Sequence, residues 1–260
     1  MRSLQVRLPI IVRTAESCGS SIIAIKTRLK TIKRKNHPGT RLCRSVDNMD
    51  KLVRKIEVPL AKNIVQKAGL YLVPKERLGE LAEVAAEAYQ DYPLHNWFMG
   101  GKYDEIASKL LMQISLKTMT EDAVIYADSE EINGFAAWLP FGFTGNKAIP
   151  FLLSGGLKLI LHSGLGIINR LSAYENYAMG LKKEYTDNYD WYLFNLSIKK
   201  DAQGKGIASK LMRPMLQFCD DERMVAYLET NKQSNVGLYR HYGFDLMKEE
   251  QIPKSTVTHY

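Results

Sequence analysis

The spacing of apolar residues predicts a chain of mixed helices and strands. Leucines and alanines recur at helical intervals over residues 75–89, so we expect an amphipathic helix there and a second helix over residues 103–119. Residues 123–127 and 133–139 are apolar and rich in β-favouring side chains, with a polar turn between them. This pattern predicts two paired strands after the two helices.

The segments around these elements predict shorter pieces of structure. Strands are expected over residues 53–58 and 70–73, with a helix over residues 61–68 between them. Residues 149–168 are apolar, but a lysine, a histidine and four glycines interrupt them. Since a membrane span needs about 20 predominantly apolar residues, helices packed beside a substrate cleft are favoured over a span.

A strand, a glycine loop and a helix follow one another between residues 191 and 216. Residues 191–198 are rich in aromatic and β-favouring side chains, and apolar residues recur at helical spacing from Ile207 onward. Gly204 and Gly206 lie between the two elements. This order brings unpaired backbone N–H groups and the positive end of a helix to one point, where we expect a phosphate or pyrophosphate. A plain turn that caps the helix is the alternative interpretation.

Two motifs in this part of the chain resemble those of the GNAT N-acyltransferase superfamily. Residues 203–208 read QGKGIA, similar to the family's acyl-CoA-binding motif of Gln or Arg, two variable residues, Gly, one variable residue, and Gly or Ala. Residues 234–244 resemble its second signature, an Asn and a Tyr four apart followed by Gly-Phe. The resemblance covers the chain from about residue 70 onward. It implies an α/β (α+β) GNAT fold, in which a mixed central sheet flanked by helices is splayed between its fourth and fifth core strands.

The resemblance also implies how acetyl-CoA would bind. Strands over residues 191–198 and 225–229 would part near their carboxyl ends, and the pantetheine arm would lie in the gap like an extra strand. The implied main-chain contacts to this arm are Leu196, Ser197 and Ile198, with the Leu196 N–H donating to the thioester carbonyl. The implied pyrophosphate site is Gln203, Gly204, Lys205, Gly206, Ile207, Ala208 and Ser209.

Asn235 and Tyr239 are the implied site residues of the second motif. Four residues apart on a helix, they share a face. The Asn235 amide would bind the pantetheine arm, and the Tyr239 phenol would give a proton to the departing thiolate. The alternative is that Tyr239 is a core aromatic residue and Asn235 a helix cap.

The general base is not settled by the resemblance. Some family members carry a glutamate at the position that Tyr192 occupies here. Glu229, at the end of the next strand, is the first candidate for the proton acceptor, followed by His162 and His95. A chain of water molecules to solvent is equally compatible with the sequence.

These features predict an enzyme of the acyltransferase class, an N-acetyltransferase that moves acetyl from acetyl-CoA to a primary amine by direct attack in a ternary complex. A small-molecule amine is the favoured acceptor, although a peptide terminus, a lysine or an antibiotic stays open. A non-catalytic acyl-CoA-binding module is the alternative function. No metal is implied, because the five histidines have no ligand-like spacing.

Charge and cysteine content change this picture only at the N-terminus. The net charge is +8, but residues 1–48 alone hold eleven Lys or Arg and two acidic residues, while the remainder holds 25 basic and 26 acidic residues. We expect residues 1–48 to be a loosely ordered basic extension and residues 49–260 to be the acetyltransferase domain, with a helical insertion at about 140–190. Three widely spaced cysteines favour a reducing, cytoplasmic compartment, with Cys219 buried.

Four interpretations of residues 1–48 remain open. They are a solvated tail, a transit-like segment that would target an organelle, a contact to nucleic acid or an anionic surface, and a segment that precedes a true start at Met49. If binding to nucleic acid or an anionic surface were the main role of residues 1–48, this segment would tether the domain there, since the rest of the chain is nearly neutral. The sequence does not indicate an oligomeric state.

Overall fold

The computed structural model describes residues 12–13, 41–119, 123–140, 148–186 and 190–260. The α-helices are α2 (Arg41–Lys67), α3 (Leu78–Ala88), α4 (Pro93–Phe98), α5 (Glu105–Met119), α6 (Ala148–Phe151), α7 (Leu157–Ser163), α8 (Leu165–Thr186), α9 (Ile207–Asp221) and α10 (Gln233–His241). The strands are β1 (Val12–Arg13), β2 (Tyr71–Leu72), β3 (Val124–Ala127), β4 (Gly134–Leu139), β5 (Asp190–Ile198), β6 (Val225–Leu228), β7 (Glu250–Gln251) and β8 (Thr258–His259). Short 3₁₀ turns cover Lys75–Arg77 and Lys200–Ala202, and a π-helix covers Leu152–Gly156.

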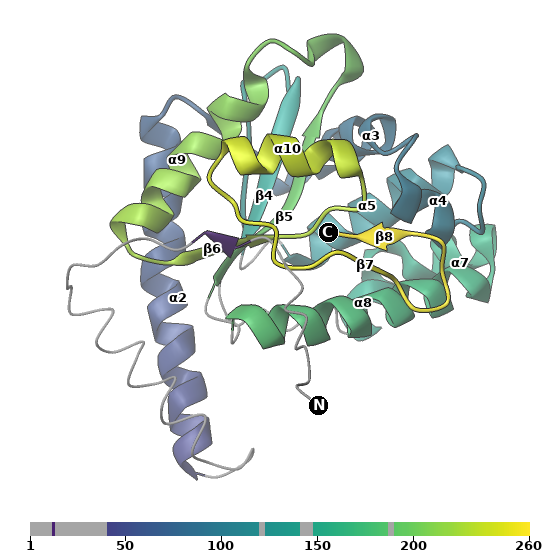
Figure 1. Ribbon diagram of the computed structural model, residues 1–260, viewed down its shortest axis with the longest axis horizontal. Helices are drawn as coiled ribbons and strands as arrows, with labels where there is room; N and C mark the ends of the chain where they lie inside the picture. The colour runs from purple at the N-terminus through teal and green to yellow at the C-terminus, as the bar shows by residue number, and fades with distance from the viewer. Residues whose placement is uncertain (1–11, 14–40, 120–122, 141–147, 187–189) are drawn as a thin grey trace, which may run out of the picture.

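One mixed sheet organises the molecule (Figure 1). Its strand order is β1-β6-β5-β4-β3-β2, and β5 and β6 run parallel while the other neighbours are antiparallel. Counted from β2, the strands β5 and β6 are the fourth and fifth of the core. They pair only over their first residues and separate beyond Leu193 and Leu228. This confirms the expected fold class, a mixed sheet flanked by helices and splayed at that place.

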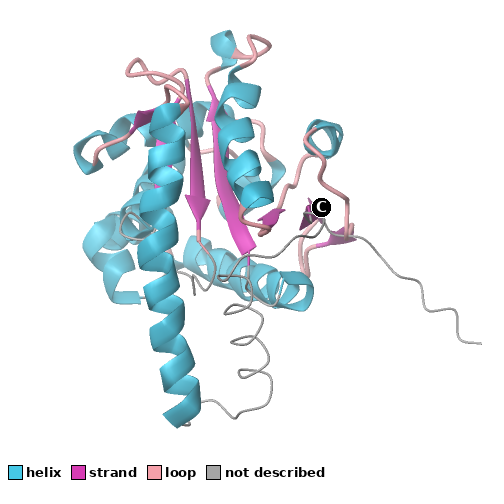
Figure 2. Cartoon of the chain, turned by 90° about the vertical axis from the view of Figure 1, so that its left-hand side faces the viewer, coloured by secondary structure: helices cyan, strands magenta, loops and turns pink. Residues whose placement is uncertain are grey.

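Helices cover both faces of the sheet (Figure 2). On one face, α2 and α9 bury Val65 and Leu211 against the large side chains Trp138 and Trp191 of the central strands. On the other face, α3 and α5 supply a second apolar cluster. Since α9 begins where β5 ends, this packing fixes the start of α9 beside the carboxyl end of that strand.

The expected strand over residues 53–58 is wrong, because these residues belong to helix α2. Their β-branched residues favour a strand locally, but Val58, Ala61 and Val65 recur at helical spacing and are buried in the cluster with α9. Tertiary packing therefore outweighs local propensity here. The helix also continues across residues 48 and 49, where we expected the domain to begin. The other residues of the expected extension, apart from β1, lie outside the described part of the chain.

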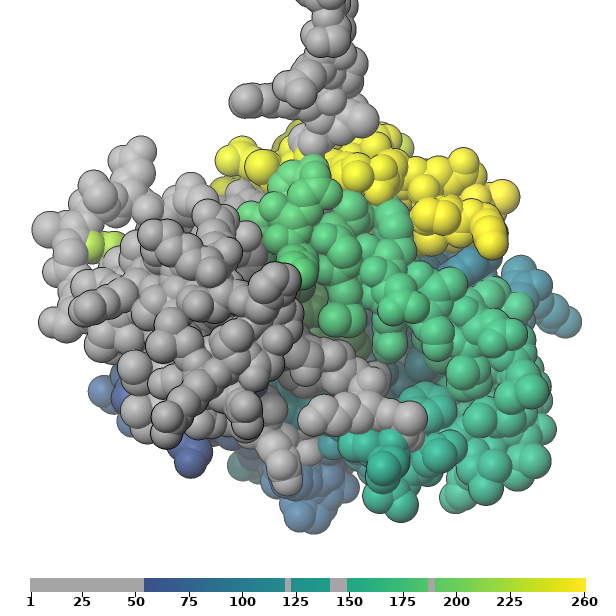
Figure 3. All heavy atoms as spheres, turned by 90° about the horizontal axis from the view of Figure 1, so that it is seen from below, coloured from purple at the N-terminus to yellow at the C-terminus, as the bar shows by residue number. Residues whose placement is uncertain are grey.

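The expected helical insertion is formed by α6, the π-helix, α7 and α8, with residues 141–147 and 187–189 outside the described part. Figure 3 shows α7 and α8 on one side of the molecule, with the C-terminal segment along their edge. These helices pack on α4 and α5 through a third apolar cluster. Among the described residues, none of the helices has the length and apolar character that crossing a bilayer requires.

Candidate active site

The separation of β5 from β6 leaves backbone groups of β5 without a partner strand. β5 pairs with β6 from Asp190 to Leu193 but continues along β4 as far as Ile198. The Lys199 N–H donates to the Asn133 carbonyl on the β4 side, at 2.9 Å. Because the backbone groups of successive residues in a strand point to opposite sides, those of Leu196 and Ile198 are directed into the gap.

The three residues expected to contact the pantetheine arm face different sides of this strand. Leu196 and Ile198 offer amides to the gap, whereas the main chain of Ser197 is directed towards β4. The Ser197 hydroxyl is buried and donates to Asn195 Oδ1 at 2.9 Å. Ser197 thus belongs to the packing behind the gap rather than to its edge.

Gly204 and Gly206 form the loop at the start of α9. Both have positive φ, +75° and +79°, and a Cβ added at either would meet no atom within 4 Å. Glycine is therefore required by the backbone conformation and not by crowding within the protein. The N–H groups of residues 204–209 make no hydrogen bond within the described part of the chain. They lie at the N-terminal end of a 15-residue helix, an arrangement that favours a bound anion.

The other side chains of the expected pyrophosphate site hold the loop in place. Gln203 Nε2 donates to the Ile198 carbonyl at 3.2 Å, which ties the loop to the end of β5. The Ser209 hydroxyl lies 3.0 Å from the Tyr242 hydroxyl at the end of α10. Lys205 is exposed, while Ile207 and Ala208 are half-buried in the first turn of α9. A diphosphate would thus meet main-chain amides and one mobile cation.

Asn235 and Tyr239 lie on α10, as expected. The Asn235 amide donates to Thr230 Oγ1 at 3.1 Å and so closes the turn between β6 and α10. Tyr239 is buried with its ring against Phe244. Burial, and then the nearby phenols of Tyr92 and Tyr89, raise the pKa of Tyr239 well above its usual range. Its hydroxyl is therefore protonated at neutral pH and close to two residues that line the adjoining cavity.

A cavity of about 420 Å³ opens at the carboxyl ends of the two separating strands. Tyr192, Phe194 and Asn195 of β5 line it, together with Glu229 and Asn231 beyond β6. One face of α8 forms another wall through residues three or four apart, which are Ile168, Leu171, Glu175, Ala178 and Lys182. The insertion thus packs beside this cavity.

A β-bulge in β5 aims two successive side chains into this cavity. Opposite Ala137 and Trp138 the register of β5 shifts by one residue, so that Phe194 and Asn195 both line the cavity. Asn195 is buried and its Nδ2 donates to the Tyr89 hydroxyl at 2.8 Å. Sequence reasoning missed Asn195, although a buried-strand pattern that contains one amide was a usable signal.

Three tyrosines surround the Glu229 carboxylate. The Tyr227 hydroxyl donates to Oε1 at 2.5 Å, and those of Tyr174 and Tyr192 donate to Oε2 at 3.0 and 3.5 Å. Burial first, and the Glu229 charge second, raise the pKa of all three phenols. All three phenols therefore remain hydrogen-bond donors to this carboxylate.

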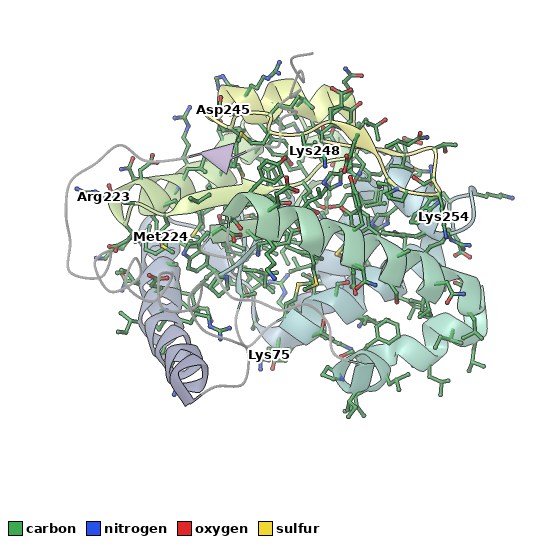
Figure 4. The ribbon with its side chains drawn as sticks, turned by 60° about the horizontal axis from the view of Figure 1, so that its bottom comes forward. Lys75, Arg223, Met224, Asp245, Lys248 and Lys254 are labelled. Atoms are coloured by element: carbon green, nitrogen blue, oxygen red, sulfur yellow. The ribbon has the colours of Figure 1, made fainter. Side chains whose placement is uncertain are left out.

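A buried histidine lies next to this group. His259 on β8 has its ring packed edge-on against Tyr177, with ring centres 5.3 Å apart, and burial lowers its pKa. Neither of its ring nitrogens has a hydrogen-bond partner among the described residues. Figure 4 draws the side chains between α8 and the C-terminal strands and labels Lys248 among them. The Lys248 ammonium forms an ion pair with Glu250 at 2.8 Å.

The two lesser base candidates lie in different places. His95 lines the cavity, is stacked on Tyr89 with ring centres 4.3 Å apart, and has its pKa lowered to about 4 by burial, so it is neutral at pH 7. His162 lies outside the cavity lining, with Nε2 2.8 Å from Asp104 Oδ2. Cys219 is buried in α9, as expected. The described residues contain no group of three or more His, Cys, Asp or Glu side chains arranged to hold a metal ion.

Comparison with known proteins finds a family match over part of the chain. Residues 165–244 match the model of the acetyltransferase (GNAT) family. An uncharacterized N-acetyltransferase of Schizosaccharomyces pombe is 31% identical over 113 residues, which is 43% of this chain and 43% of that relative, so the two align over less than half of their lengths.

Two solved structures are similar to this chain at low sequence identity. An acetyltransferase related to histone acetyltransferase HPA2, from Corynebacterium glutamicum, has a TM-score of 0.48 and 16% identity, over 73% of this chain and 93% of that one. Arylalkylamine N-acetyltransferase 2 of Aedes aegypti has a TM-score of 0.46 and 19% identity, over 74% and 97%. The separated strands, the glycine loop and α10 all fall within the residues that match the family model, so this part of the chain is similar to GNAT acetyltransferases.

Proposed function

We propose that this protein is an N-acetyltransferase that moves acetyl from acetyl-CoA to the primary amine of a small molecule, by direct attack within a ternary complex. The observation that supports this most is the position of the cavity. Its lining residues from β5 and from the end of β6 stand where the two strands separate, so an acceptor in the cavity would meet a thioester held in the gap.

The residues present fit acetyl-CoA, which would supply an activated acyl thioester. The unbonded amides of residues 204–209 suit its diphosphate, since glycine leaves the approach to the loop open. The amides of Leu196 and Ile198 suit the polar arm that would lie along β5. In this proposal the Leu196 N–H also donates to the thioester carbonyl and stabilises negative charge on its oxygen.

Tyr239 is proposed as the proton donor to the leaving sulfur. Its raised pKa keeps the phenol protonated until a thiolate develops nearby. Glu229 is proposed as the group that binds the acceptor's ammonium and takes its proton. Because Tyr174, Tyr192 and Tyr227 hold this carboxylate in place by hydrogen bonds, its first role is to orient the ammonium, and proton removal follows only when the amine has lost its solvation.

The test is turnover of acetyl-CoA by the full chain with a panel of amines. Released thiol is measured with a thiol-reactive dye, and the acetylated amine is identified by mass spectrometry. We expect transfer, and Tyr239→Phe should lower kcat roughly 100-fold or more while acetyl-CoA affinity is kept. Glu229→Gln should raise KM for the amine and lower kcat. Tight binding of acetyl-CoA with no transfer to any amine would favour the acyl-CoA-binding module instead.

A further inference from the structure

We infer that the acceptor is a primary monoamine with an aromatic or alkyl body, whose ammonium binds Glu229 while its body fills the cavity. This inference rests on the proposed function and specifies its substrate class. It excludes polyamines, lysine side chains and amino sugars as good acceptors. The charges and the walls of the cavity support it independently.

The charge balance of the cavity favours a cation. Among the described residues, the charged side chains in its lining are Glu175, Lys182 and Glu229. Lys182 is buried, and its ammonium lies 3.1 Å from the fully buried carboxylate of Asp190, which neutralises it. Glu229, half-buried at the end of β6, then gives the described lining an acidic group that a bound acceptor would meet. An acceptor with a carboxylate or phosphate would be repelled.

The walls favour an apolar body. Two ring pairs stand in the lining, Tyr89 stacked on His95 and Phe98 edge-on to Tyr174, with ring centres 4.3 and 5.6 Å apart. The rest of the apolar lining includes the rings of Phe151 and Phe194 and several aliphatic or thioether side chains, among them Leu94, Leu111, Met112 and Leu139. A body that covers these side chains gains by removing apolar surface from water.

The described lining offers one half-buried place for an ammonium. Glu229 provides this place, and its three tyrosine donors leave room for a single cationic partner. A second ammonium on the same molecule would lie either among aliphatic side chains, where an unpaired charge is costly, or beside the exposed Glu175, where a surface ion pair contributes little. The aromatic faces can stabilise one cation near Glu229.

The first experiment measures kcat/KM for straight-chain amines from propylamine to hexylamine, with 2-phenylethylamine, cadaverine and spermidine beside them. We expect kcat/KM to rise about threefold to fourfold for each added methylene until the cavity is filled. Hexylamine and 2-phenylethylamine should exceed cadaverine by at least about tenfold. Faster acetylation of cadaverine or spermidine would overturn this inference while the proposed transfer stands. Acetylation of no amine would instead defeat the proposed function itself.

A substitution in the cavity wall shows whether a lining residue contacts the acceptor or only supports the fold. Phe98 is 5% exposed and lines the cavity, so Phe98→Ala should lower the ratio of kcat/KM for hexylamine over propylamine at least about threefold. Leu60→Ala on α2, 40% exposed, is the matched control and should keep the ratio. A ratio unchanged in Phe98→Ala, with the protein folded by circular dichroism, would overturn the inference.

Discussion

The role of the glycine loop in ligand binding can be tested by making the same substitution at two glycines that share a backbone conformation. Gly206 and Gly69 have nearly the same backbone angle, φ of +79° and +71°, and neither would bring an added Cβ within 4 Å of another atom. Gly206 precedes α9, whereas Gly69 follows α2. At both positions, replacing glycine by an L-residue in the left-handed region destabilises the folded state by about 1–2 kcal/mol. The substitution also lowers the conformational entropy of the unfolded chain, which offsets about 0.4–1 kcal/mol of that loss. Gly206→Ala and Gly69→Ala should each lose about 1 kcal/mol of stability.

The two variants should differ only in ligand affinity. A net loss of about 1 kcal/mol corresponds to a fall of roughly 2–4 °C in Tm for a domain of this size, measured by thermal unfolding without ligand. In Gly206→Ala the new methyl group would hold a diphosphate away from the amides. Losing one charge-assisted hydrogen bond, about 1.5–3 kcal/mol, raises Kd for acetyl-CoA roughly 10- to 100-fold by calorimetry. Equal Kd values for both variants and the parent protein would refute the loop as the diphosphate site.

Three further predictions concern stability. His95 has a folded pKa of about 4 against the usual 6.5, so the unfolded chain takes up a proton first as pH falls and stability is lost, by about 2 kcal/mol between pH 7.5 and 5. Urea unfolding should show this loss in the parent and a smaller one in His95→Gln; equal losses would contradict the assignment. Lys182→Met leaves the Asp190 carboxylate buried without its partner and should cost about 3–5 kcal/mol, while adding Asp190→Asn should recover much of that loss. Independent, additive effects in this double-mutant cycle would show that the pair is not coupled. Leu153, 84% exposed, should tolerate Gln within about 0.5 kcal/mol in the same unfolding assay, and a larger change would mean that it is covered in solution.

The local part of the fold could be predicted from the sequence. β5, the loop and α9 are contiguous, and their signals are short-range, namely aromatic and β-favouring residues, two glycines and helical spacing. The strand expected in the middle of α2 is wrong because Val53 and Val58 favour strands locally, whereas burial of the helix against α9 decides the outcome. A segment of six residues does not show which of its side chains will be buried against a helix more than 140 residues further along the chain.

The acceptor side of the site could be predicted only in outline. Glu229 was chosen for its place after a strand, but its environment comes from Tyr174 on α8, Tyr192 on β5 and Tyr227 on β6, which the tertiary fold brings together. The Asn195 side chain points into the cavity because of a β-bulge, and that bulge arises where β5 pairs with β4. Long-range packing and strand register are therefore what the sequence reasoning lacked.

Under the proposed function, the interrupted sheet ties the abundance of the folded protein to acetyl-CoA. Unpaired strand edges invite other chains to add to them, and here two such edges face each other in the middle of the molecule. A molecule that occupies this opening adds to the unfolding free energy by mass action, about 2.7 kcal/mol at one hundred times its Kd. We therefore expect preparations stripped of coenzyme A to aggregate sooner on warming, and cells starved of acetyl groups to lose the protein as well as its product.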